Sequence, residues 1–86
     1  MTVTLDTIPA DASLNLRGTP CPINFVRTKL KLETMLPGEI LEVWLDAGEP
    51  IEQVPDSLRM EGYVIESIAE SKDDRSTYFV LRVQHP

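Results

Sequence analysis

The hydrophobic and polar positions along the chain alternate in four short stretches, and this alternation predicts four β-strands. Polar and apolar residues alternate over Ser13–Arg17, as they do in a short half-buried strand. The other predicted strands are residues 39–45, 63–70 and 77–84. A polar turn over residues 71–76 separates the last two, which is typical of an antiparallel hairpin. The residues that we expect to face the core are Leu41, Val43 and Leu45 in the second strand and Phe79, Leu81 and Val83 in the fourth.

The first predicted helix runs from Pro22 to about Met35. Proline suits the first helical position, because the N–H that it lacks would have no partner there. Pro37 cannot continue the helix, and Gly38 turns freely, so the helix ends just before them.

The second predicted helix precedes Gly62, which is a typical stop signal. Its apolar residues at helical spacing are Ile51, Val54 and Leu58. Pro55 interrupts this pattern. We therefore expect a loop over residues 46–50, an irregular helix start, and regular turns only after the proline.

The first helix carries apolar residues on two nearly opposite sides. One stripe consists of Phe25, Thr28, Leu32, Met35 and Leu36. The other consists of Ile23, Val26 and Leu30. A helix that lies on one sheet buries only one side well. We expect the first stripe to be core, because it is longer and reaches the helix end. The second is then partly exposed, or covered by long flanking side chains.

The element order β-α-β-α-β-β predicts an α+β fold, a two-layer α/β sandwich. The crossover helix makes the first two strands parallel, and both helices cover one face of a mixed four-stranded sheet. The other face carries Trp44, Tyr78 and Val80, and it is either a surface for association or an ordinary solvated face. Residues 1–12 show no period, so we expect a flexible N-terminal tail followed by one domain over residues 13–86.

Charge narrows the classes of function. The net charge of −6 argues against direct binding of nucleic acid. No apolar stretch is long enough to span a membrane, and the N-terminus has no signal-peptide pattern, so we expect a cytoplasmic protein. Residues 13–32 form a positive segment in this acidic chain. They contain no acid and four basic residues, which are Arg17, Arg27, Lys29 and Lys31.

The single cysteine, Cys21, lies inside that positive segment and just before the first predicted helix. One cysteine cannot form a disulfide within the chain, and one cysteine with one histidine makes a structural metal site improbable, so we expect no metal and no cofactor. The start of a helix stabilises anions, so a thiol there has a lowered pKa and more reactive thiolate. The alternative is that Cys21 is a small buried hydrophobe. His85 is expected to be a surface residue without a catalytic role.

The segment around Cys21 resembles the TusA/SirA-like sulfur-carrier family. Members of that family read approximately L-D-L-R-G, then a short turn, then C-P-x-P at the start of the first helix; this chain has the corresponding sequence LNLRGTPCP over residues 14–22. Residues 37–39 match the P-G-E that precedes the family's second strand. Asp46, Pro55 and residues 62–63 fall where its later elements lie. The resemblance covers about residues 13–84 and implies a TusA-like domain.

The resemblance implies a sulfurtransferase that holds a persulfide on Cys21 and relays sulfur between proteins. The donor would be a protein such as a cysteine desulfurase, and a second protein would accept the sulfur. Pro22 would fix the first helical turn, and Arg17 and Gly18 would shape the loop before it. We expect a monomer that binds neither membrane nor nucleic acid.

Asn24 departs from the family pattern, because it stands where C-P-x-P has its second proline. Its side-chain amide is a candidate donor to the sulfur. The alternative function is a non-catalytic interaction or regulatory module, in which the positive helix and its exposed apolar stripe dock on a partner. The candidate partner-binding residues are Arg27, Lys29, Lys31, Ile23, Val26 and Leu30.

Overall fold

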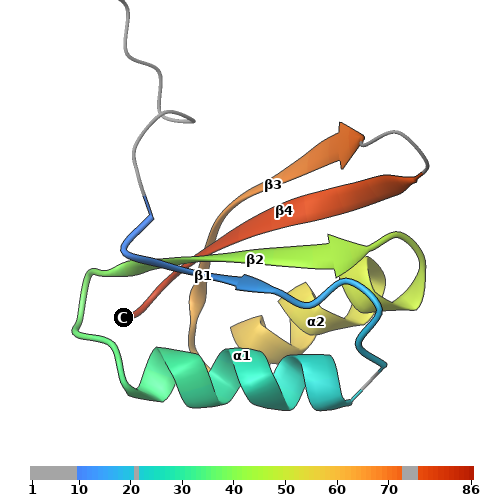
Figure 1. Cartoon of the computed structure of the whole chain (residues 1–86). Helices are drawn as coiled ribbons and strands as arrows, with labels where there is room; N and C mark the ends of the chain where they lie inside the picture. Colours follow the sequence, from blue (N-terminus) through green and yellow to red (C-terminus); the bar gives the residue numbers. More distant parts are fainter. Residues whose placement is uncertain (1–9, 21, 73–75) are drawn as a thin grey trace, which may run out of the picture.

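The computed structural model describes residues 10–20, 22–72 and 76–86 of the chain, arranged as two helices against a four-stranded sheet (Figure 1). The element order matches the predicted β-α-β-α-β-β. The elements are β1 (Ala12–Asn15), α1 (Ile23–Glu33), β2 (Ile40–Asp46), α2 (Glu49–Met60), β3 (Val64–Lys72) and β4 (Thr77–Gln84).

The sheet is mixed, with the strand order β1-β2-β4-β3. β1 and β2 are parallel, as the crossover through α1 predicts, and β4 is antiparallel to both β2 and β3. Both helices cover the same face of the sheet, so the fold is the predicted two-layer sandwich (Figure 1). β3 continues to Lys72, two residues beyond the predicted strand, because the polar hairpin pairs further than its composition suggests.

Strict alternation along β2 places the core between the sheet and the helices. Leu41, Val43 and Leu45 are fully buried, and their neighbours on β4 are Val83, Leu81 and Phe79 respectively. Phe79 shares this face, although it is only half-buried. From the helices, Leu32, Val54 and Leu58 close the core. Burial of these aliphatic side chains is the main stabilising contribution to the fold.

The opposite face of the sheet is covered by neither helix. Trp44 pairs with Val80 and Asp46 pairs with Tyr78, in register positions that alternate with the core pairs. The structure therefore confirms that Trp44, Tyr78 and Val80 lie on the open face.

The prediction of which stripe of α1 faces the core is largely confirmed. Thr28, Leu32 and Met35 are buried, and Phe25 packs partly against the core. The prediction is wrong for Leu36, since 69% of its surface is exposed. The helix ends at Glu33, so Leu36 no longer follows helical spacing.

The expected irregular start of α2 is also wrong. The helix is continuous from Glu49, and Pro55 lies inside it. Pro55 is buried, so burial of its ring offsets the one backbone hydrogen bond that a proline removes. Pro50, within the first two positions, favours the early start. Neither helix of the described part of the chain is long and apolar enough to cross a membrane.

Candidate functional site

The loop between β1 and α1 carries the motif residues that precede Cys21. Its first residue, Leu16, is buried and donates its N–H to the Trp44 carbonyl at 3.0 Å, which extends the parallel pairing beyond β1. The N–H of Thr19 then closes a turn on the Leu16 carbonyl at 3.0 Å. Gly18 has φ +80°, a conformation that side chains with a Cβ rarely adopt. The glycine of the motif is therefore needed for this turn.

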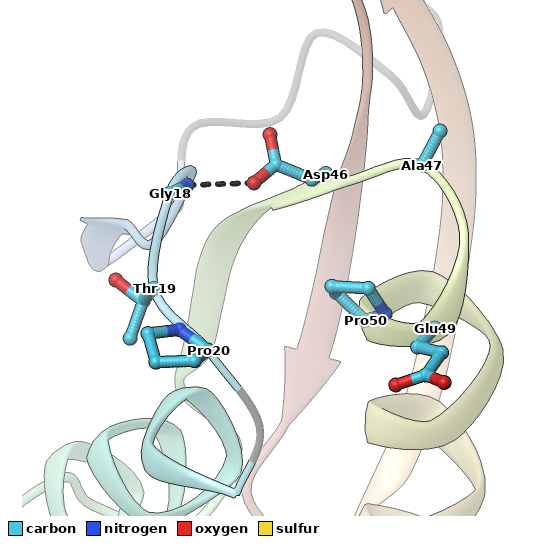
Figure 2. Close-up of a pocket in the computed structure, with 7 residues that line it drawn as sticks. All are labelled: Gly18, Thr19, Pro20, Asp46, Ala47, Glu49 and Pro50. Carbon is cyan, nitrogen blue, oxygen red and sulfur yellow. Dashed lines mark hydrogen bonds between the residues drawn. The ribbon is translucent and has the colours of Figure 1, made fainter.

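Asp46 holds this loop from the neighbouring strand. It is the last residue of β2, and because β1 and β2 are parallel, their carboxyl ends meet at the same edge of the sheet. Oδ2 of Asp46 accepts a hydrogen bond from the Gly18 N–H at 2.6 Å (Figure 2). Bonds to an ionised acceptor are among the stronger ones in proteins, so this contact fixes the loop.

A cleft of about 450 Å³ lies between this loop and the segment after β2 (Figure 2). Gly18, Thr19 and Pro20 form one side, and Pro20 directly precedes Cys21 in the sequence. The other side is formed by Asp46, Ala47, Glu49 and Pro50. No chemical role was expected for Asp46 from the sequence, although its place at the end of a parallel strand was a usable signal.

Arg17 extends over the open face of the sheet. Its guanidinium carbon lies 4.5 Å from the ring centroid of Tyr78 and 5.0 Å from that of Trp44. The Nε and the backbone N–H of Arg17 both donate to Oδ1 of Asn15, at 3.1 and 3.2 Å. These cation–π and hydrogen-bond contacts anchor the loop at a second point.

The first turn of α1 differs from the expected one in its cap. Pro22 is the cap residue rather than the first helical residue, and it provides no side-chain hydrogen bond. The Asn24 N–H donates to the Pro20 carbonyl at 3.1 Å, so helix-like bonding begins before the helix itself. No acidic residue lies in this first turn.

Asn24 is fully buried, which was not predicted from the sequence. The available signal was its position four residues before Thr28, on the core stripe. Oδ1 of Asn24 accepts a hydrogen bond from the Phe25 N–H at 2.7 Å, and the Asn24 carbonyl accepts one from Thr28 Oγ1 at 2.8 Å. Only oxygen can accept from the Phe25 N–H, so Nδ2 is the other atom, and it has no partner among the described residues. A buried donor without a partner costs roughly 1–3 kcal/mol.

The second stripe of α1 is exposed. Ile23, Val26 and Leu30 are 48%, 45% and 58% exposed, and Arg27 between them is exposed as well. Lys29 pairs instead with Glu61 beyond the end of α2, and this hydrogen bond and charge raise the pKa of Lys29. Lys31 is half-buried in the last turn of the helix.

The remaining predictions from the sequence concern Cys21, His85 and a metal site. Cys21 itself lies outside the described residues. His85 is distant in the sequence from the motif; it stacks edge-on against Tyr63 with ring centroids 6.0 Å apart. Within residues 10–20, 22–72 and 76–86, no group of three or more His, Cys, Asp or Glu side chains is arranged to hold a metal ion.

The fold and the motif together define a class of small α+β protein with a cleft beside the loop that leads into its first helix. A solved SirA-like protein from Desulfitobacterium hafniense has the same fold: its TM-score is 0.64, with 20% sequence identity over 84% of this chain and 95% of that one. The family model described as sulfurtransferase TusA matches residues 12–84. The chain therefore belongs to the TusA family.

Relatives from several organisms are named "putative sulfur carrier protein". The one from Archaeoglobus fulgidus is 44% identical over 61 residues, which cover 71% of this chain and 69% of that protein. The one from Thermotoga maritima is 41% identical over 58 residues, 67% of this chain and 73% of that protein. The Escherichia coli relative YedF is 35% identical over 63 residues, 73% and 82% of the two chains. Family and relatives together support a role in sulfur transfer.

Proposed function

We propose that this protein carries sulfur as a persulfide on Cys21 and relays it from a sulfur-donor protein to a sulfur-acceptor protein. The observation that carries the proposal is the first turn of α1, which begins two residues after Cys21 and contains no acidic side chain. The start of a helix has the effect of about half a positive charge. That field favours an anionic sulfur, and the absence of a nearby carboxylate in the turn leaves the field unopposed.

The proposed loading step exchanges one sulfur–sulfur bond for another. The Cys21 thiolate attacks the outer sulfur of a persulfide on the donor, R–S–SH. The bond between the two donor sulfurs breaks, the donor leaves as R–S⁻, and Cys21 becomes Cys21–S–SH. Transfer to the acceptor repeats this exchange with the acceptor's nucleophile. No net oxidation occurs, so no cofactor is required.

The cleft beside the loop supports access of partners to the sulfur. One wall is the segment 18–20 that leads directly into Cys21, and this wall is held by Asp46. A donor segment that enters the cleft would therefore approach along a fixed surface. Transfer between two proteins requires such an approach, because the sulfur is never released into solution.

The exposed stripe Ile23, Val26 and Leu30 is the partner surface that we propose for docking. It begins on the first turn of α1, so a partner that covers it lies next to Cys21 in the chain. Arg27 adds a positive charge within the stripe. We further propose that the protein acts in the cytoplasm, because a single thiol stays reduced in that compartment. We also propose that it acts as a monomer.

The test is intact-protein mass spectrometry after incubation with a cysteine desulfurase and cysteine. Wild type should gain the mass of one or more sulfur atoms, and a reductant should remove it. The matched control is Cys21→Ser, which keeps the size of the side chain and should gain nothing. Equal gain by Cys21→Ser, or no gain by wild type with any desulfurase or persulfide donor, would contradict the proposal.

A non-catalytic interaction module is the second candidate function, and the exposure of the same stripe favours it. Val26→Asn separates the two, because it makes the stripe polar without adding a charge near the helix start. In a sulfur carrier, this substitution should slow loading by the donor protein but leave loading by a small-molecule persulfide unchanged. In an interaction module, a purified partner binds Cys21→Ser as well as wild type and binds Val26→Asn more weakly, and wild type takes up no sulfur.

A further inference from the structure

β3 is an edge strand, so one side of its backbone is not paired within the sheet. The strand order β1-β2-β4-β3 places β4 on one side of β3 and no element on the other (Figure 1). In such a strand, about half of the backbone N–H and C=O groups point away from the sheet. Among the described residues, no backbone hydrogen bond from an element other than β4 reaches residues 64–72. These groups are therefore available to a further strand.

The free edge of β3 is long and, over most of its length, regular. β1, at the opposite edge of the sheet, has four residues, whereas β3 has nine. The pairing of β3 with β4 is irregular between Ile65 and Ser67 and continues without a shift from Ser67 to Lys72. A short strand or a bulge is a common protection of an exposed edge. The first part of β3 has that protection, and residues 67–72 do not.

The side of this edge that faces the helix layer exposes an apolar side chain. Ile68 pairs with Leu81, which is fully buried, so both lie on the face that the helices cover. Ile68 is nevertheless 43% exposed at the edge of the sheet. A fifth strand beside β3 would cover Ile68 and extend the core sideways. Removal of this apolar surface from water favours such an addition.

The charges of β3 select the strand that fits beside it. Glu70 and Lys72 lie on the same face as Ile68, because their partners on β4 alternate in step with Leu81. Both are exposed, and neither forms an ion pair with another described residue. Opposite charges directly across a strand pair attract, and like charges repel. The fitting strand therefore has an apolar residue opposite Ile68, a basic residue opposite Glu70 and an acidic residue opposite Lys72.

The other side of the edge has room for a large side chain. The residues of β3 on the open face are small: Ser67, Ala69 and Ser71. They line a hollow of about 270 Å³, which Val80 of β4 also lines, together with charged side chains of β2 and β4. An added residue opposite Ala69 would lean over this hollow. Small apolar groups surrounded by polar ones suit an aromatic ring with a polar tip.

We propose that residues 67–72 of β3 bind an extended segment of a partner protein as a fifth strand of the sheet. Backbone hydrogen bonds to the free edge supply affinity, and the side chains on the two faces supply specificity. The partner segment has the apolar, basic and acidic residues on its helix-side face and a large residue on its open face. This site goes beyond the proposed sulfur transfer and does not rest on it, because β3 and β1 are opposite edges of the sheet.

A second copy of this chain fits the edge poorly. If two β3 strands pair in antiparallel with Ile68 opposite Ile68, Glu70 of each copy lies opposite Glu66 of the other. If the pairing is centred on Ala69, Ile68 lies opposite a carboxylate, and if it is centred on Glu70, two glutamates meet. Charged residues commonly prevent edges from pairing with themselves. The same charges favour the complementary strand.

The first experiment titrates the ¹⁵N-labelled protein with a synthetic peptide, acetyl-ETKYIT-amide, and follows the backbone amides by NMR. Aligned antiparallel to β3, its glutamate lies opposite Lys72 and its lysine opposite Glu70. Its tyrosine then lies opposite Ala69 and its isoleucine opposite Ile68. The amide resonances of residues 67–72 should shift, and amide hydrogens on the free edge should exchange more slowly. Absence of these shifts at millimolar peptide would overturn the proposal.

The matched control is acetyl-KTEYIT-amide, which has the same composition but places like charges opposite Lys72 and Glu70. It should bind wild type about tenfold more weakly at low salt. The double variant with Glu70→Lys and Lys72→Glu should reverse this preference. Both positions are exposed, so we expect the variant to fold as wild type does. Equal affinity of wild type for the two peptides, or an unchanged preference in the variant, would contradict the proposal.

Two further outcomes would also reject it. Shifts of residues 67–72 that depend on protein concentration without peptide would show that a second copy occupies the edge. Shifts confined to the exposed stripe of α1 would place the peptide there instead. Cys21→Ser should bind the peptide as wild type does, so this test and the sulfur-loading test can fail independently.

Discussion

The two helices of this small protein begin in opposite electrostatic conditions. α2 has Glu49 and Glu52 in its first turn, so its own carboxylates complement the positive end of its dipole. α1 has no acid in its first turn, and neither helix has a side-chain hydrogen bond at its cap. The start of α2 is therefore neutralised within the chain, whereas the start of α1 is left available to an anion.

The buried sides of the two helices also differ, because that of α1 becomes polar toward its start. α2 buries Val54, Pro55 and Leu58, while the buried side of α1 changes from Leu32 to Thr28 and then to Asn24 toward its start. Apolar packing is thus replaced by polar groups as α1 approaches Cys21. Residues that lower stability are expected at functional sites, and the polar start of α1 is a local departure of this kind.

The largest expected effect is on the free energy of unfolding, through the apolar core to which both helices contribute. Leu32→Ala and Leu58→Ala each remove a fully buried side chain, and each should lower the free energy of unfolding by about 3 kcal/mol. Urea unfolding followed by circular dichroism measures this loss. Leu30→Ala, on the exposed side of α1, is the control and should change stability by no more than about 0.5 kcal/mol. Equal losses for Leu30 and Leu32 would show that the burial pattern is wrong.

The second prediction makes the start of α1 resemble that of α2. Ile23→Glu places a carboxylate at an exposed position of the first turn. Its charge should raise the pKa of the Cys21 thiol and slow alkylation near neutral pH by about tenfold, while stability rises by roughly 0.3–1 kcal/mol. Alkylation kinetics and urea unfolding measure both effects.

Two controls accompany this substitution. Ile23→Gln adds a polar group of similar size without charge and should leave the alkylation rate near that of wild type. Glu52→Gln removes an acid from α2 and should reduce stability slightly, with no effect on the thiol. If Ile23→Gln slows alkylation as much as Ile23→Glu, the cause is not the field at the helix start.

The third prediction concerns the contact that holds the loop before Cys21. Asp46→Ala removes the acceptor of the Gly18 N–H and should cost about 1 kcal/mol of stability. The looser loop should also slow sulfur loading in the desulfurase assay. Asp46→Asn keeps an oxygen and should lose less on both measures. Loading by Asp46→Ala at the wild-type rate would show that the contact does not position the loop.

The smallest effect is expected for the ion pair that joins α1 to the end of α2. Glu61 raises the pKa of Lys29 above 10.5, so the pair stabilises the fold fully below that pH, and its contribution disappears as the pH rises through the raised pKa. The difference in unfolding free energy between wild type and Lys29→Met should therefore become smaller at strongly alkaline pH. It should also narrow in high salt, because the pair is partly exposed. Urea unfolding across pH and salt measures this, and a difference that grows above pH 10.5 would contradict the sign.

The sequence predicted most of the fold because its alternating strands are short and regular. The parallel pairing of β1 with β2 and the two-layer arrangement followed from element order alone. Leu36 and Pro55 were misassigned because each depends on tertiary context: one on where α1 ends, the other on burial of the proline ring.

The candidate site was only partly predictable for the same reason. The motif located Arg17, Gly18 and Asn24, but a sequence motif does not identify residues from other parts of the chain that contact it in the folded protein. The acceptor for Gly18 comes from the end of β2, at a separation of 28 residues. That Asn24 is buried with an unused donor follows from packing, which a residue pattern does not encode.

The stacking of Arg17 on the open face gives the protein an optical reporter of its own. Trp44 is the only tryptophan of the chain, and the side chain above it belongs to the loop that leads into Cys21. Indole emission depends on the charges and hydrogen bonds around the ring, and Trp44 Nε1 also donates to Glu42 at 3.3 Å. Displacement of Arg17 would therefore change the fluorescence of Trp44. Each arrival or departure of sulfur that moves this loop becomes visible in the unlabelled protein, in real time.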